Sequence, residues 1–266
     1  MFGCKLPKVD IRDYKVDSKR AGVLDYPATF ELSHPRIKNQ FMVNSCCAHA
    51  SSSVLEYYAG GKYNLSTDFI YGMDRYVNND TEQGMYLVDA CKIIKQYGDM
   101  LEEDCTGNTE VPNCFNKVEK LLTDEEKLKR AYEFGVSSYY ACNTDNDIKY
   151  ALMTYGPVLA GVDWYKDSVG KDGVINFNKK SPQGYHAVMI YGWNETGWLV
   201  QNSWGKTWGK DGCFVLPYAD GPREARIMID EENEINIDGL VKPKTLTWIQ
   251  IIVKVINFII NIFVKK

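Results

Sequence analysis

The sequence has few histidines and no closely spaced cysteine pair of the kind that binds metal. Only three histidines stand among the 266 residues, and no C-x-x-C motif occurs. Zinc sites in proteins are built from neighbouring cysteine and histidine ligands, so a zinc site is not expected.

An excess of charge of one sign is also absent. The 31 Lys and Arg against 35 Asp and Glu leave a net charge of −4, with both signs interspersed along the chain. Nucleic-acid binding normally requires a basic patch, so no nucleic acid is expected as a partner.

The start of the chain lacks a long apolar run. Its first residues, MFGCKLPKVDIRDYKVD, are charged throughout. We therefore expect no secretory signal peptide and no long pro-segment.

The eight cysteines do not form the dense framework of a small secreted domain, because they are scattered over a long chain. Cys105 and Cys114 flank a loop and could be bridged. The alternative is a set of separate thiols in a reducing compartment.

Hydrophobic periodicity divides the chain into a helical part and a strand-rich part. It predicts helices at about 46–59, 66–77, 85–97, 123–130 and 145–155. It predicts strands at about 134–140, 157–164, 186–193, 197–202, 213–216 and 223–229. This order indicates an α+β protein of two lobes, helical over about 38–122 and strand-rich over about 132–229.

The end of the chain has a different composition. Acidic residues mark residues 230–244 as a linker, and an apolar run with one polar stripe follows at 245–266. If helical, residues 245–264 could span a bilayer, lie in its interface, or associate with other helices. Alternatively, this segment could be a helix that packs on the protein's own core, or a β-rich run that is prone to aggregation.

A candidate nucleophile stands at the start of the first predicted helix. Ser45 is a plausible N-cap for it, which places Cys46 in the first turn. There the free N–H groups and the helix dipole favour a thiolate. Because Cys47 follows directly, it is the alternative nucleophile, and His49 is expected to face back into the lobe as a structural residue.

Partners for such a cysteine occur in the strand-rich half. His186 precedes an apolar strand, and Asn202 stands sixteen residues later, after a returning strand. Asn202 could then bind one ring nitrogen of His186 while the other faces the cysteine. The aromatic run at 163–165 could line a specificity pocket or pack in the core.

Three motifs resemble those of the papain-like cysteine peptidases, in the same order. They are Q-x5-C with serine before the cysteine, HAV followed by a strand, and NSWG-x-x-WG-x-x-G, and the match covers about residues 8–229. The 140 residues between Cys46 and His186 fall within the family's range. DIRDY near the start and GPV before His186 are more similar to bacterial and phage-type members than to lysosomal ones.

The resemblance implies a helical lobe with the cysteine, a β-barrel-like lobe with the histidine and asparagine, and a cleft between them. It implies Cys46 as nucleophile, His186 as base and then acid, Asn202 as the group that orients His186, and Gln40 in the oxyanion hole. Trp204 would shield the His–Asn bond with Trp208 packed nearby, and Gly84 would pair with the substrate backbone.

The sequence departs from the family pattern around the nucleophile. The family's Cys-Trp-Ala-Phe is replaced by Cys46-Cys47-Ala48-His49, Val43 replaces a disulfide-forming cysteine, and Phe41 and Asn44 replace glycines. The lost disulfide partner fits a reducing compartment, and the bulky replacements predict a bulkier entry loop.

The leading hypothesis is therefore a thiol peptidase of the cytoplasm or a virion, membrane-associated if the tail inserts. It would act on a peptide or protein, with no metal or cofactor. The alternative is a non-catalytic binding or membrane-recruitment module with the same fold. The apparatus could also act on an isopeptide bond, a cell-wall peptide or the chain itself. The sequence leaves the oligomeric state open.

Overall fold

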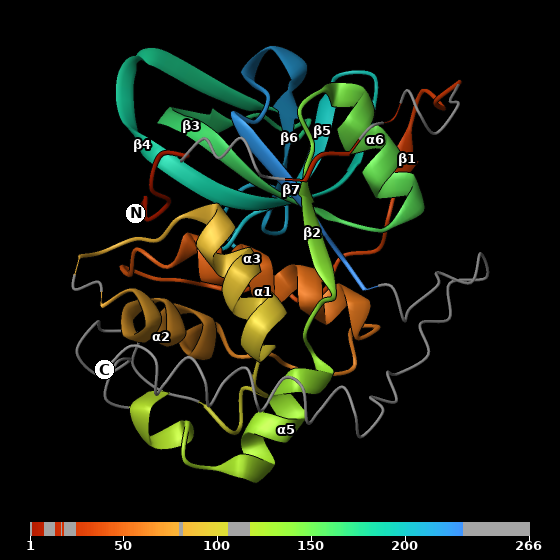
Figure 1. Ribbon diagram of the computed structural model, residues 1–266. Coiled ribbons are helices and arrows are strands. Elements are labelled where there is room, and N and C mark those ends of the chain that lie inside the picture. The colour runs from red at the N-terminus through yellow and green to blue at the C-terminus, as the bar shows by residue number, and fades with distance from the viewer. Residues whose placement is uncertain are drawn as a thin grey trace.

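The structure, a computed structural model, describes residues 2–7, 14–16, 18, 25–79, 82–105 and 118–230. Helices α1, α2, α3 and α5 gather on one side of the molecule, and the strands form a sheet on the other (Figure 1). This is an α+β arrangement, as predicted.

The helices begin and end close to the predicted positions. They are α1 (Cys46–Tyr58), α2 (Thr67–Asn78), α3 (Leu87–Tyr97), α5 (Glu125–Glu133) and α6 (Asp145–Thr154). Side-chain caps explain three of the starts, because Ser66, Asp124 and Thr144 each accept a hydrogen bond from a main-chain N–H three residues later. Gly98 ends α3 at a φ of 74°, a conformation that glycine adopts without strain.

Seven strands form one sheet in the order β2-β7-β3-β4-β5-β6, with β1 added along β4. Their bounds are β1 (Phe30–Glu31), β2 (Ser138–Ala141), β3 (Val158–Val169), β4 (Ile175–Trp193), β5 (Gly197–Gln201), β6 (Cys213–Pro217) and β7 (Glu224–Ile229). All the pairings between these strands are antiparallel.

The β3–β4 hairpin extends further than the sequence predicts. Strand β3 continues from Trp164 to Val169, and β4 begins at Ile175 rather than at His186. Only Ile175 and Phe177 alternate with exposed asparagines, whereas none of residues 178–184 is buried. Most of the extension therefore lacks the apolar alternation from which a strand is predicted.

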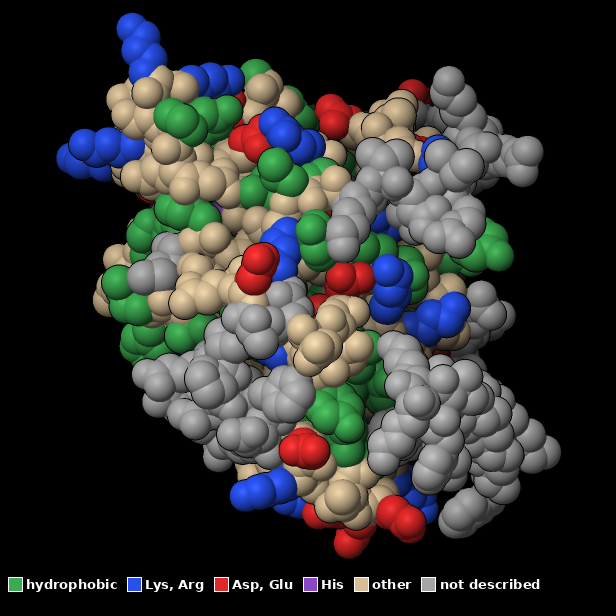
Figure 2. Space-filling view, turned by 60° about the vertical axis from the view of Figure 1, so that its left-hand side comes forward, with side chains coloured by type: hydrophobic (Ala, Val, Ile, Leu, Met, Phe, Trp, Pro, Cys, Tyr) green, Lys and Arg blue, Asp and Glu red, His purple; other side chains and the backbone are tan. Residues whose placement is uncertain are grey.

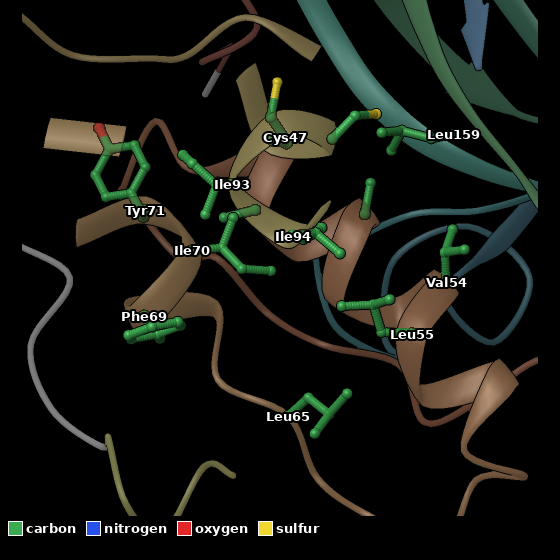
Figure 3. Close-up of a cluster of buried hydrophobic side chains, with 14 of the residues drawn as sticks. Cys47, Val54, Leu55, Leu65, Phe69, Ile70, Tyr71, Ile93, Ile94 and Leu159 are labelled. Atoms are coloured by element: carbon green, nitrogen blue, oxygen red, sulfur yellow. The ribbon is translucent and has the colours of Figure 1, made fainter. Parts of the chain in front are cut away.

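Two groups of buried side chains pack on the two faces of the sheet. One joins α1, α2, α3 and α5 to the inner face of the sheet, and part of it is drawn in Figure 3. The other lies among the strands and α6 and includes Trp164, Trp193 and Trp198. Leu128 and Tyr132 of α5 belong to the first group.

The surface charge and the end of the chain are relevant to the predictions about nucleic-acid and membrane partners. On the face in Figure 2, basic and acidic side chains are interspersed. Among the described residues, no helix is both long and apolar enough to cross a membrane. Apart from Asp230, the predicted linker at 230–244 and the predicted helix at 245–266 lie outside the described residues.

Candidate active site

Cys46 is the first residue of α1, as predicted. Ser45 stands at the N-cap position, but its side chain makes no capping hydrogen bond and its Oγ lies 3.2 Å from His49 Nδ1. Ser45 is therefore the N-cap residue, as predicted, but the side-chain hydrogen bond that such a cap normally makes is absent. His49 Nδ1 also lies 3.0 Å from the Ser45 carbonyl oxygen, which fits the structural role expected of it.

His186 and Asn202 are brought together by β4 and β5. Met189 of β4 pairs with Gln201 of β5, and because the strands are antiparallel, Asn202, the next residue, lies one step closer to His186 along β4. His186 Nε2 and Asn202 Oδ1 are 2.8 Å apart. Because an amide oxygen only accepts hydrogen bonds, Nε2 carries the proton, which leaves Nδ1 as the nitrogen able to serve Cys46.

Aromatic rings enclose the His186 imidazole. The ring centroid of Trp204 is 4.7 Å from that of His186, and that of Trp164 is 4.9 Å away. Trp208 in turn meets Trp204 edge to face at 5.0 Å. The sequence leaves the role of Trp164 open between a pocket and the core; it is a buried residue packed against both His186 and Trp204.

Gln40 is buried beside the loop that carries Asn202. Its Oε1 accepts a hydrogen bond of 2.6 Å from Ser203 Oγ, and its main-chain N–H donates to the Ser203 carbonyl at 2.9 Å. Its side-chain Nε2 donates to the Val43 carbonyl at 2.8 Å. These bonds fix the Gln40 amide in the loop that leads into α1.

Residues 2–5, here called the cleft strand, run between the helical part and the sheet. Gly3 O accepts a hydrogen bond from Met85 N–H at 2.8 Å, and Lys5 N–H donates to Met85 O at 2.9 Å. On the other side, Cys4 N–H donates to Tyr185 O at 3.3 Å. In Figure 1 the red start of the chain lies at the boundary between helices and strands.

The cleft strand lies over the candidate catalytic residues. The Phe2 ring meets the rings of His186 and Trp204 edge to face, at 6.0 and 5.9 Å. Cys46 and His186 are both 0% exposed. No sequence pattern predicts this arrangement, because the pairing of the strand uses main-chain atoms.

Gly84 lies at the edge of this cleft, but its polar groups face inward. Its N–H donates to Tyr71 Oη at 3.2 Å, and its carbonyl accepts a hydrogen bond from Arg75. The next residue, Met85, presents both its N–H and its carbonyl to the cleft strand. Met85 is thus a cleft residue that the sequence patterns do not reveal.

Burial dominates the electrostatics of the site. Burial raises the pKa of the Cys46 thiol well above its usual value, and the neighbouring Cys47 raises this pKa further. His186 acts in the opposite direction and lowers the pKa of Cys46. Burial also lowers the pKa of His49 to about 3, so this imidazole is neutral near pH 7. Among the described residues, no group of three or more His, Cys, Asp and Glu side chains could hold a metal ion.

A cysteine at a helix N-terminus, a histidine on an antiparallel sheet and an asparagine directly after a strand of that sheet are the arrangement typical of papain-like proteins. The model of the papain family cysteine proteases matches residues 27–231, and the chain belongs to this family.

The relatives and solved structures agree with this membership. A cathepsin B-like cysteine proteinase of Schistosoma japonicum is 32% identical over 40% of this chain and 34% of its own length. An uncharacterized peptidase C1-like protein of Acanthamoeba polyphaga mimivirus is 28% identical over 68% of this chain and 63% of its own length. The chain thus matches about a third to two thirds of the length of these relatives.

Among solved structures, xylellain, a cysteine protease from Xylella fastidiosa, superimposes with a TM-score of 0.73 at 20% identity. The superposition covers 86% of this chain and 96% of xylellain. At this identity the likeness shows the papain-like fold alone.

Proposed function

We propose that the protein is a cysteine-type endopeptidase that hydrolyses peptide bonds in a peptide or protein substrate. The observation that carries the proposal is the position of His186, which is held by Asn202 at 2.8 Å and lowers the pKa of the Cys46 thiol. A nucleophile, its base and a group that orients the base are the minimum that this chemistry needs.

The first step requires displacement of the cleft strand, since Cys46 has no exposed surface while the strand is in place. Displacement readmits water and removes part of the burial that raises the pKa of Cys46. The thiol proton then passes to His186 Nδ1, and an imidazolium held by Asn202 Oδ1 stabilises the thiolate.

The thiolate attacks the substrate carbonyl carbon, and the carbonyl oxygen becomes an oxyanion. The Gln40 side-chain amide and the Cys46 main-chain N–H are the donors proposed for that oxyanion. His186 gives its proton to the leaving amine, which departs and leaves a thioester on Cys46. Water, deprotonated by His186, attacks the thioester and releases the acid product.

Two further residues complete the proposal. Trp204 covers the His186–Asn202 hydrogen bond and limits the access of water to it. Gly84 was predicted to pair with the substrate backbone, and because its own polar groups are engaged by Tyr71 and Arg75, we assign this pairing to Met85.

A second candidate is a non-catalytic binding module. The complete burial of Cys46 and the raised pKa of its thiol favour it, because a thiol in this state is a weak nucleophile. The two candidates differ in whether Cys46 reacts at all.

The test is hydrolysis of a peptide library together with labelling by a thiol-directed epoxide. Cys46→Ala should abolish both, and Cys47→Ala is the matched control that should keep labelling at Cys46. Loss of the label in Cys47→Ala but not in Cys46→Ala would move the nucleophile to Cys47. A wild-type chain that neither cleaves nor takes the label would favour the binding module.

Membrane contact through residues 245–264 also stays a proposal. The apolar run of this segment supports it. Flotation of the full chain with lipid vesicles, compared with a chain that ends at residue 244, would test it. Equal recovery of both chains in the vesicle fraction would exclude a role for the segment.

A further inference from the structure

Three buried cysteines gather where the cleft strand crosses the start of α1. Cys46 and Cys47 begin α1, and Cys4 is in the strand that crosses them. All three are buried thiols. The proposed reaction uses only Cys46, so Cys47 and Cys4 have no part in it.

The main chain of Met85 brings Cys4 and Cys47 together. The residues on both sides of Cys4 are hydrogen-bonded to Met85, through Gly3 O and Lys5 N–H. Cys47 Sγ donates to the same Met85 carbonyl oxygen at 3.3 Å. In Figure 3 the sulfur of Cys47 points away from Leu55 and Leu65, at the edge of the apolar cluster.

Of the two helix cysteines, Cys47 is the one whose thiol reaches the main chain of Met85. Met85 forms a β-bridge with Cys4, so its main chain places Cys47 beside Cys4. A bond between Cys4 and Cys47 would therefore fix the strand over Cys46 without consuming the Cys46 thiol.

We propose that Cys4 and Cys47 form a reversible disulfide that locks residues 2–5 in the cleft. In the oxidised chain the strand is held across Cys46 and His186. In the reduced chain it can leave, and the cleft opens. The doubled cysteine thus separates two tasks, with the nucleophile at Cys46 and the lock at Cys47.

The oxidant that the proposal names is a small disulfide such as glutathione disulfide. When the strand opens, the Cys4 thiolate attacks one sulfur of glutathione disulfide, which releases one glutathione and leaves a mixed disulfide on Cys4. When the strand returns, the Cys47 thiolate attacks the Cys4 sulfur and releases the second glutathione. Two thiols lose two protons and two electrons, which the glutathione disulfide takes up.

Opening comes first because the closed state protects both thiols. Burial raises the pKa of Cys4 to about 11, so little of it is thiolate while the strand is docked. Exposure of Cys4 on opening removes this burial and makes the thiol reactive.

The test uses the full chain carrying Cys46→Ala. Without the Cys46 thiol, the test does not depend on the proposed function. A disulfide can then also be assigned to Cys47 without confusion with the adjacent cysteine. The protein is equilibrated in glutathione buffers from reducing to oxidising, digested without reduction and analysed by mass spectrometry. A peptide that links residues 4 and 47 should dominate in the oxidising buffers and vanish with dithiothreitol.

Two double variants serve as controls. Cys46→Ala/Cys4→Ser should give no link, and Cys46→Ala/Cys213→Ser, which removes a buried cysteine outside the cleft, should keep it. Circular dichroism checks that the chain is folded in each buffer. The proposal would be overturned if the folded chain yielded Cys4 and Cys47 only as thiols or as separate glutathione adducts in every buffer.

A second measurement tests the locking itself. The Met85 amide is hydrogen-bonded to Gly3 O, so its hydrogen exchange reports the opening of the strand. Oxidation of the Cys46→Ala chain should slow this exchange roughly tenfold or more. A disulfide that forms and leaves the exchange rate unchanged would show that the strand is not locked.

Discussion

At the scale of single residues, the site depends on one side-chain hydrogen bond. Asn202 Oδ1 lies 2.8 Å from His186 Nε2, and both side chains are buried. The bond sets the proton on Nε2 and directs Nδ1 to the nucleophile. Without it the imidazole could still accept a proton, but its ring nitrogens would no longer be distinguished.

Asn202→Ala should therefore slow catalysis without changing substrate binding. We expect kcat to fall about ten- to a hundredfold, roughly 1.4 to 2.8 kcal/mol of transition-state stabilisation, with KM nearly unchanged. Steady-state kinetics on a peptide substrate measure both. Asn176→Ala, which alters an exposed asparagine in β4, is the control. A fall confined to KM would contradict an orienting role.

Gly3 is a second position where one residue controls the site. A Cβ atom added to Gly3 would lie 1.9 Å from the main-chain oxygen of Asn44. Because a backbone atom cannot turn away as a side chain can, Gly3→Ala should displace the cleft strand. We expect labelling of Cys46 by a small epoxide to become about tenfold faster, which corresponds to about 1.4 kcal/mol of lost docking.

The control for this change lies in the same segment. Leu6 is 58% exposed, so Leu6→Ala should leave the labelling rate as it is in the wild type. Equal labelling rates for Gly3→Ala and wild type would show that the cleft strand does not limit access to Cys46.

The residues of the site differ in how far the sequence could predict them. Cys46, His186, Asn202 and Gln40 stand in motifs, so the sequence alone proposes each of them for the site, and the fold gathers them around the start of α1. Met85 could not be identified, because it acts through its main chain and leaves no side-chain signal.

At the scale of elements, α2 supports the edge of the cleft. Tyr71 Oη accepts a hydrogen bond from Gly84 N–H at 3.2 Å. Arg75, one turn further along α2, donates to the carbonyls of Glu82 and Gly84. These bonds hold residues 82–85 so that the polar groups of Met85 point into the cleft.

Tyr71→Phe should loosen this edge with little effect on the chemistry. The change removes the acceptor of Gly84 N–H and keeps the ring, so KM should rise severalfold while kcat changes little. Tyr58→Phe removes a hydrogen bond of 2.6 Å to Met228 O, outside the cleft edge, and is the matched control. A loss in thermal stability shared by both variants, without a rise in KM for Tyr71→Phe, would count against the supporting role.

The elements were predictable to different degrees. The helices α2, α5 and α6 carry side-chain caps and apolar faces, so local sequence sets their ends. In the distal β3–β4 hairpin, Ile175 and Phe177 pack on the core, but none of residues 178–184 is buried, and this part is held by pairing with β3. A pairing of this kind leaves no periodic signal in the sequence.

At the scale of the whole molecule, the cleft strand connects the two halves. It is bonded to Met85 on the helical side and to Tyr185 of β4 on the other. The division into a helical and a strand-rich part followed from hydrophobic periodicity. The strand between them could not be predicted, because residues 2–5 are paired by main-chain atoms to positions far along the chain.

The stability of the whole molecule should depend on pH through His49. Its Nδ1 lies 3.0 Å from the Ser45 carbonyl, directly before the nucleophile, and burial lowers its pKa from 6.5 to about 3. Between these values the unfolded chain binds a proton that the folded chain does not. The free energy of unfolding should therefore fall as the pH drops from about 6.5 towards 3, by at most about 1.4 kcal/mol per pH unit from this residue.

Urea unfolding of the wild type and of His49→Asn between pH 4 and pH 7 separates this contribution from that of the carboxylates. Asparagine keeps an N–H donor close to the position of Nδ1 and does not titrate. We expect the variant to be the less stable chain at pH 7, and the difference to shrink or reverse on acidification. Parallel stability curves for the two chains over this range would show that His49 takes up a proton equally in the folded and unfolded states.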